Sequence, residues 1–154
     1  MISRRRRTEV LVEGDPTLAR DLAALVEREA PVREVVAPHQ GLVMCQVRET
    51  ARNTRFYLGE ALMTECRVRL GDAEGLGVVL GSDASLARSL AVVDAALAPG
   101  SGVGELAGQI ERSILVAERE LDRRRARQAA RTLASRVSFD EMGGQDMSVQ
   151  AVVR

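Results

Sequence analysis

The chain has 154 residues, of which 22 are basic and 22 acidic, with one histidine and two cysteines. Every basic residue is arginine, which excludes a lysine Schiff base and a Walker-type phosphate loop. Balanced charge provides no field favouring nucleic acid, and two cysteines with one histidine provide neither a disulfide framework nor a structural zinc site.

The first predicted elements are two helices. Arg4 to Arg7 form the cationic start of a short helix, because acidic residues follow where the apolar stretch of a signal peptide would have to run. A second, amphipathic helix is predicted over residues 16–29, where Asp15-Pro16 gives a cap and a first-turn proline. Its apolar positions recur at helical spacing, at Leu18, Leu22 and Leu25. No segment has the length or apolar character of a membrane span.

A run of short strands follows. Residues 32–37 and 41–48 are rich in valine, leucine and methionine and are predicted to be strands. Between them, Pro38-His39-Gln40-Gly41 has the composition of a turn, so a hairpin of the two strands is one possible arrangement. Further strands are predicted at residues 55–58, 61–70 and 76–81, separated by Gly59-Glu60 and by residues 71–75. This order predicts a small antiparallel meander sheet.

Residues 61–70 alternate between apolar and charged side chains, which is typical of a half-buried strand. Leu62, Thr64, Cys66, Val68 and Leu70 share one face, and Glu65, Arg67 and Arg69 share the other. Three interpretations of Arg67 and Arg69 stay open: a solvated sheet face, a contact with carboxylates of another subunit, or a clamp for a phosphate or phosphonate. Cys45 and Cys66 are expected to be buried, reduced thiols.

The second half of the chain is predicted to be helical. Ser82-Asp83 can cap a helix that ends at Pro99-Gly100, and a second helix runs from Glu105 to about Ser135. The expected apolar positions are Leu86, Leu90, Val93 and Leu97 in the former, and Ala107, Ile110, Ile114, Ala117 and Leu121 in the latter. A helix of roughly 30 residues spans about 45 Å, so its far half is expected to leave the body of the protein.

The C-terminal segment has no structural period. Apolar Phe139 and Met142 stand beside glycines, which favours docking of this segment onto another chain, since they bury little in a free tail. We expect one α+β domain over residues 1–142, with N-terminal helices, the meander sheet, one packing helix and the long C-terminal helix. Residues 143–154 are expected to be a flexible tail.

No catalytic, cofactor-binding or metal-binding residue is predicted. His39 is interpreted as an exposed turn residue, and no serine or cysteine has a recognisable base beside it. Gly75-Leu76-Gly77 precedes a strand, whereas a dinucleotide fingerprint follows one. Gly81-Ser82-Asp83 could meet an anion at a helix start, but Asp83 would occupy that position itself, which favours a helix cap.

Four short motifs stand in a fixed order along the chain: Phe56-Tyr57-Leu58-Gly59-Glu60, Arg67-Val68-Arg69-Leu70, Gly81-Ser82-Asp83 with Asp94-Ala95-Ala96-Leu97, and Arg136-Val137-Ser138-Phe139. Taken together, their order and spacing resemble those of the G subunit of the bacterial carbon-phosphorus lyase core complex, the PhnG family. The likeness covers about Arg7 to Met142, nearly the whole chain. Departures include residues 49–55, where the family has a glycine-rich turn, Ser82, where it has arginine, and Asp140-Glu141, where it tends to be aromatic or neutral.

The resemblance implies that the chain belongs to a cytoplasmic assembly with the H, I and J subunits, and that the I subunit is its main partner. That complex acts as a ribose 1-methylphosphonate 5-triphosphate synthase: it uses MgATP and an organic phosphonate to form a ribose 1-phosphonate 5-triphosphate. The G subunit is then an accessory chain without catalytic residues or a bound cofactor of its own. The residues expected to contact partners are Arg67, Arg69, Arg136, Phe139 and Met142.

A rival hypothesis keeps the protein self-sufficient. In it, the chain is a homodimeric interaction domain or a small-anion-binding domain, and the helix over residues 105–135 pairs with its own symmetry mate. The neighbouring genes, light scattering and titration with phosphonate or ATP would distinguish the two hypotheses.

Overall fold

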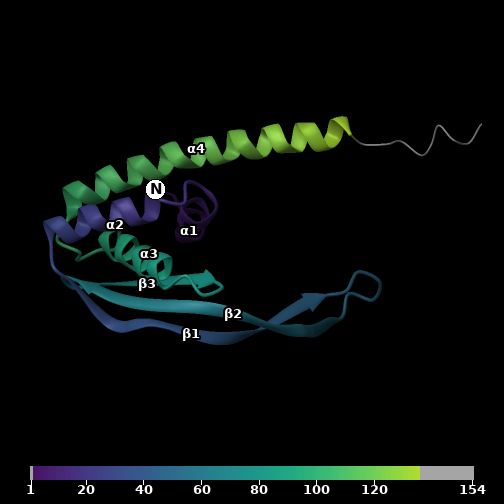
Figure 1. The fold of residues 1–154 in the computed structure, drawn as a ribbon, viewed down its shortest axis with the longest axis horizontal. Coiled ribbons are helices and arrows are strands. Elements are labelled where there is room, and N and C mark those ends of the chain that lie inside the picture. Colours follow the sequence, from purple (N-terminus) through teal and green to yellow (C-terminus); the bar gives the residue numbers. More distant parts are fainter. Residues whose placement is uncertain (1, 136–154) are drawn as a thin grey trace, which may run out of the picture. The chain divides into compact units, whose positions relative to one another are not determined.

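The structure is a computed structural model that describes residues 2–135. Over this range the chain forms four helices and a three-stranded antiparallel sheet (Figure 1). The elements are α1 (Arg4–Glu13), α2 (Leu18–Glu29), β1 (Val32–Arg48), β2 (Arg55–Leu70), β3 (Ala73–Leu80), α3 (Ala84–Ala96) and α4 (Gly104–Ala134). The predicted α+β class is confirmed, as are a helix after the sheet and a long C-terminal helix. Arg136, Phe139, Met142 and the predicted tail lie outside the described residues.

The chain groups into two compact units, Met1–Leu121 and Asp122–Arg154. The first unit holds the sheet, α1 to α3 and the first half of α4. The described part of the second unit is the last turns of α4, where every side chain is exposed except the half-buried Arg125. The single domain expected over residues 1–142 stays a prediction.

The strand order is β1-β2-β3, and the strands differ in length. β1 pairs with β2 along its whole length, from Val32 opposite Leu70 to Arg48 opposite Arg55. β3 pairs with β2 only between Met63 and Leu70. Residues 41–62 therefore form a two-stranded distal ribbon that runs past the end of β3 (Figure 1).

Two predicted strand breaks are wrong. Residues 38–41 lie inside β1, and Gly59-Glu60 lies inside β2. Antiparallel pairing continues through both places. The register shifts once between Val36 and His39 of β1 and once at Leu58 of β2, and these shifts accommodate the irregular residues as bulges. Pro38 is tolerated because β1 is an edge strand, where a missing N–H costs no ladder hydrogen bond. The turn before β3 is also shorter than predicted, because β3 already begins at Ala73.

The core forms where α3 packs on the sheet. The predicted alternation in β2 is confirmed from Thr64 to Leu70, since Thr64, Cys66, Val68 and Leu70 are buried. Leu62, predicted for the same buried face, is 38% exposed, because β3 pairs with β2 only from Met63 onward. Gly77 of β3 lets α3 approach closely, because a Cβ there would lie 1.8 Å from the carbonyl oxygen of Ala87. Apolar residues of the outer helices complete the cluster, among them Val10, Leu11, Val26, Ile110, Ile114 and Leu121.

Local signals fix the helix starts. Asp83 caps α3 as predicted, since its Oδ1 accepts the backbone N–H of Leu86 at 2.8 Å. The predicted start of α2 is two residues early: Thr17 is the cap position. Asp15 Oδ1 instead accepts the backbone N–H of Thr17 at 2.8 Å, and this bond lowers the pKa of Asp15.

One arginine ties three elements of the first unit together. Arg88 of α3 donates to Glu27 of α2 at 2.5 Å and to Glu34 of β1 at 2.7 Å. The bond to Glu34 is the main cause that raises the pKa of Arg88. All three side chains keep access to solvent, so this network orients the elements more than it stabilises them.

Candidate docking surface

The distal ribbon carries large apolar side chains that no other described element covers. Leu42 is 63% exposed, Tyr57 61% and Leu58 69%. An isolated two-stranded hairpin is marginally stable in water, and contiguous apolar surface of this kind marks a place of protein contact. The ribbon is therefore the first candidate for a functional surface.

Apolar residues occupy both faces of the ribbon. Side chains directly opposite each other in an antiparallel pair share a face, and neighbours along a strand alternate between faces. Leu42, opposite Leu62, and Met44 share one face; Val43, opposite Ala61, lies on the other. Phe56 and Val47 form a further apolar pair nearer the end of the ribbon. A partner could thus enclose the ribbon rather than only cover one side.

The tip of the ribbon, residues 48–55, is held by one glutamate. Glu49 accepts the backbone N–H of Arg52 at 2.7 Å, that of Ala51 at 2.9 Å and the hydroxyl of Thr54 at 3.0 Å. The bond from Arg52 is the main cause that lowers the pKa of Glu49. Asn53 takes a left-handed conformation with φ of 59°, and its side-chain oxygen accepts from Arg48 at 3.0 Å. The tip therefore has a defined shape although every residue in it except the half-buried Glu49 is exposed.

Arg67 and Arg69 lie on the sheet face opposite α3, as predicted, and both are exposed. Arg67 Nε donates to Glu65 at 2.8 Å, and Arg69 pairs with Glu74 on β3. These carboxylates partly neutralise the two guanidiniums, which weakens the case for a phosphate clamp. Leu80 on the same face is 74% exposed, so this face also has apolar character. A partner contact at Arg67 and Arg69 stays a prediction.

The two cysteines differ. Cys66 is fully buried as expected, and burial raises the pKa of its thiol. Cys45 is only half-buried, so that part of the prediction is wrong. It lies in the ribbon, beyond the reach of the helical layer that covers Cys66.

The other sequence candidates serve the fold. His39 is exposed, but it lies within β1 opposite Glu65 rather than in a turn. Gly75 and Gly77 face α3 with no room for a side chain, which accounts for them without a nucleotide. Among residues 2–135, no group of three or more histidine, cysteine, aspartate or glutamate side chains is placed to hold a metal ion.

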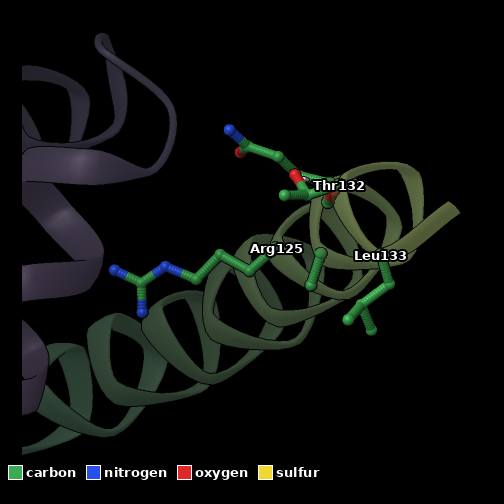
Figure 2. Close-up of a pocket in the computed structure, with 5 residues that line it drawn as sticks. Arg125, Thr132 and Leu133 are labelled. Atoms are coloured by element: carbon green, nitrogen blue, oxygen red, sulfur yellow. Dashed lines mark hydrogen bonds between the residues drawn. The ribbon is translucent and has the colours of Figure 1, made fainter. Parts of the chain in front are cut away.

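A shallow depression lies along the last turns of α4, within the second unit. It is lined by Arg125, Gln128, Ala129, Thr132 and Leu133, which come from one side of a single helix (Figure 2). Leu133 is 67% exposed there, and the described lining contains no carboxylate. This depression has the character of a helix surface rather than of a catalytic cleft.

Sequence reasoning missed the ribbon as a functional surface. The available signal was that residues 41–44 and 56–58 are apolar at consecutive positions, whereas residues 61–70 alternate. Consecutive apolar residues in a strand indicate that both faces are covered. In the ribbon, no described part of the chain covers either face, so we expect another protein to cover them.

The fold and the surface define a small α+β protein with an exposed apolar ribbon and a long terminal helix. None of the helices between residues 2 and 135 has the length and apolar character to cross a membrane. The family model described as "Phosphonate metabolism protein PhnG" matches residues 2–144. The chain therefore belongs to the PhnG family and takes part in phosphonate metabolism, which confirms the resemblance. No curated protein sequence matches the chain.

Proposed function

We propose that this chain is an accessory, non-catalytic subunit of the carbon-phosphorus lyase core complex. In this role it supports the I subunit in forming a ribose 1-phosphonate 5-triphosphate from MgATP and an organic phosphonate. The H and J subunits are the other partners in the assembly. Free thiols at Cys45 and Cys66 suit the reducing cytoplasm in which we place the complex.

The exposed ribbon is the observation that carries this proposal. Its apolar residues lie on both faces of a two-stranded segment, and no third strand formed by residues 2–135 lies beside it. Burying a large apolar side chain stabilises a complex by roughly 1.5–3 kcal/mol, so a few ribbon residues supply much of an interface. The family membership makes phosphonate proteins the partners to test first.

A second contact is proposed for the C-terminal segment. Arg136, Phe139 and Met142 lie outside the described residues but within the part matched by the family. Arginine, an aromatic ring and methionine are enriched at protein interfaces. The exposed guanidiniums of Arg67 and Arg69 are the third candidate contact.

Co-expression with a cognate I subunit tests the proposal. We expect one complex containing both chains that survives size-exclusion chromatography in gentle buffer. Separate elution of the two proteins would overturn the assignment. Saturable binding of a phosphonate or of ATP by the lone chain, together with a homodimer by light scattering, would support the rival hypothesis instead.

A further inference from the structure

The tip of the ribbon concentrates positive charge at the end of the apolar surface. Residues 48–55 contain Arg48, Arg52 and Arg55 against the single carboxylate of Glu49. Both oxygens of that carboxylate already accept hydrogen bonds from the backbone of the tip. No carboxylate of residues 2–135 forms an ion pair with any of the three arginines.

Several arginines elsewhere in the first unit do have a carboxylate partner. Arg7 pairs with Asp94, Arg67 with Glu65 and Arg88 with Glu27 and Glu34. Exposed arginines on the helices, such as Arg5 and Arg28, also lack such a pair among residues 2–135. The tip differs in gathering three arginines without a carboxylate partner in that range on one turn, which Glu49 holds in one shape.

Any protein that covers the ribbon must also receive the tip. Arg48 and Arg55 are opposite each other and directly follow the apolar pair Val47 and Phe56. An arginine taken out of water without a partner is costly, whereas a carboxylate partner can accept two parallel hydrogen bonds from it. A second copy packed ribbon against ribbon with tips together would oppose like charges, which disfavours this chain as the occupant.

We infer that the tip inserts into an acidic pocket of a partner protein, at the end of the apolar groove that receives the ribbon. This inference rests on the proposed function, which names the I subunit as the protein to test. Aspartate or glutamate side chains of that subunit pair with Arg48, Arg52 and Arg55. The apolar ribbon supplies affinity, and the tip fixes how far and in which direction the ribbon enters.

The absence of lysine from the sequence allows a direct test. Arg52→Lys introduces a side-chain amine at the tip, and a carbodiimide joins an amine to a carboxylate only when the two are in contact. In the co-expressed complex we expect a cross-link between this amine and an aspartate or glutamate of the I subunit, located by mass spectrometry. Arg28→Lys, at an exposed position on α2, is the matched control and should give no such cross-link.

A second measurement uses charge reversal. Arg52→Glu/Arg55→Glu should weaken binding to the I subunit by about tenfold at low salt, and raising the salt should shrink the difference from wild type. Arg5→Glu/Arg28→Glu makes the same change in net charge at exposed sites away from the ribbon and should bind as wild type does.

The outcomes separate the inference from the proposed function. If the wild-type chain does not bind the I subunit, both fail. If it binds, but the tip variants bind equally well and the introduced amine forms no cross-link, the inference alone is overturned. If the tip variants bind the I subunit more weakly than wild type only when MgATP is present, the tip contacts a triphosphate rather than a protein carboxylate. That result would also overturn the inference.

Discussion

The side chain of Asp94 on α3 accepts the backbone N–H of Leu76 on β3, at 3.0 Å. Leu76 lies in an edge strand, whose outward N–H groups are otherwise open to pairing with another chain. Arg4 Nε at 2.9 Å and Arg7 Nη2 at 2.8 Å donate to the same carboxylate. Asp94 thus joins α1, α3 and β3, which gives a structural role to the aspartate of the Asp94-Ala95-Ala96-Leu97 motif.

Asp94→Ala is expected to lower the free energy of unfolding by about 2–4 kcal/mol, because it leaves the mostly buried Arg7 without its partner and Leu76 without an acceptor. Urea denaturation of the isolated chain measures this. Asp94→Asn keeps an acceptor oxygen and should cost less. A change below about 0.5 kcal/mol for Asp94→Ala would show that the contact is not needed.

Gly77→Ala is expected to destabilise the protein by roughly 1–3 kcal/mol, because the added methyl group meets the backbone of α3. The thermal transition of the purified chain measures the effect. Gly41→Ala is the matched control, since a Cβ at Gly41 has no atom within 4 Å. Equal transition temperatures for the two variants would contradict the observed packing of α3 on β3.

The Glu49 carboxylate is expected to titrate below its ordinary pKa of 4.5, because the backbone N–H of Arg52 stabilises the charged form. The contribution of the Glu49 carboxylate to the order of the tip is then fully present above pH 4.5, the ordinary pKa. It is lost as the pH falls through the lowered pKa that Glu49 has in the folded chain. The amide proton shifts of Ala51 and Arg52, followed by NMR, report the midpoint. Glu49→Gln should abolish this titration, and a wild-type midpoint at or above 4.5 would contradict the assigned hydrogen bonds.

Removal of residues 136–154 is expected to abolish binding to the I subunit while leaving the thermal transition of the isolated chain nearly unchanged. The reason is that Arg136, Phe139 and Met142 are assigned to the partner rather than to the core. Phe139→Ala/Met142→Ala in the full chain is the milder variant. Parallel loss of binding and of thermal stability would show that this segment belongs to the core.

Local signals in the sequence were sufficient for most of the helices. Asp83 marked the start of α3, and the stripe containing Ile110, Ile114 and Leu121 marked the buried side of α4. Each of these depends on residues within a few turns of one another. The alternation in residues 61–70 likewise identified the buried face of β2.

The strand lengths and the point where the ribbon leaves the sheet could not be found from such local signals. Pro38 and Gly59 are turn residues by composition, yet both lie inside long strands, because pairing across the sheet outweighs local preference. The exposure of Leu42 and Tyr57 follows from β3 ending at Leu80, far along the chain. No pattern within residues 41–62 specifies where that third strand stops.

The affinity of the I subunit for a ribbon variant tests the central claim most directly. Leu42→Thr/Met44→Thr introduces β-branched side chains suited to a strand but removes apolar surface from the ribbon. Val12→Thr/Val116→Thr is the matched control, at two exposed apolar positions on α1 and α4. We expect the ribbon variant to bind about 100-fold more weakly than wild type, with an unchanged thermal transition, and the control to bind as wild type does. Equal affinity of the ribbon variant and wild type would contradict the assignment of the ribbon as the docking surface.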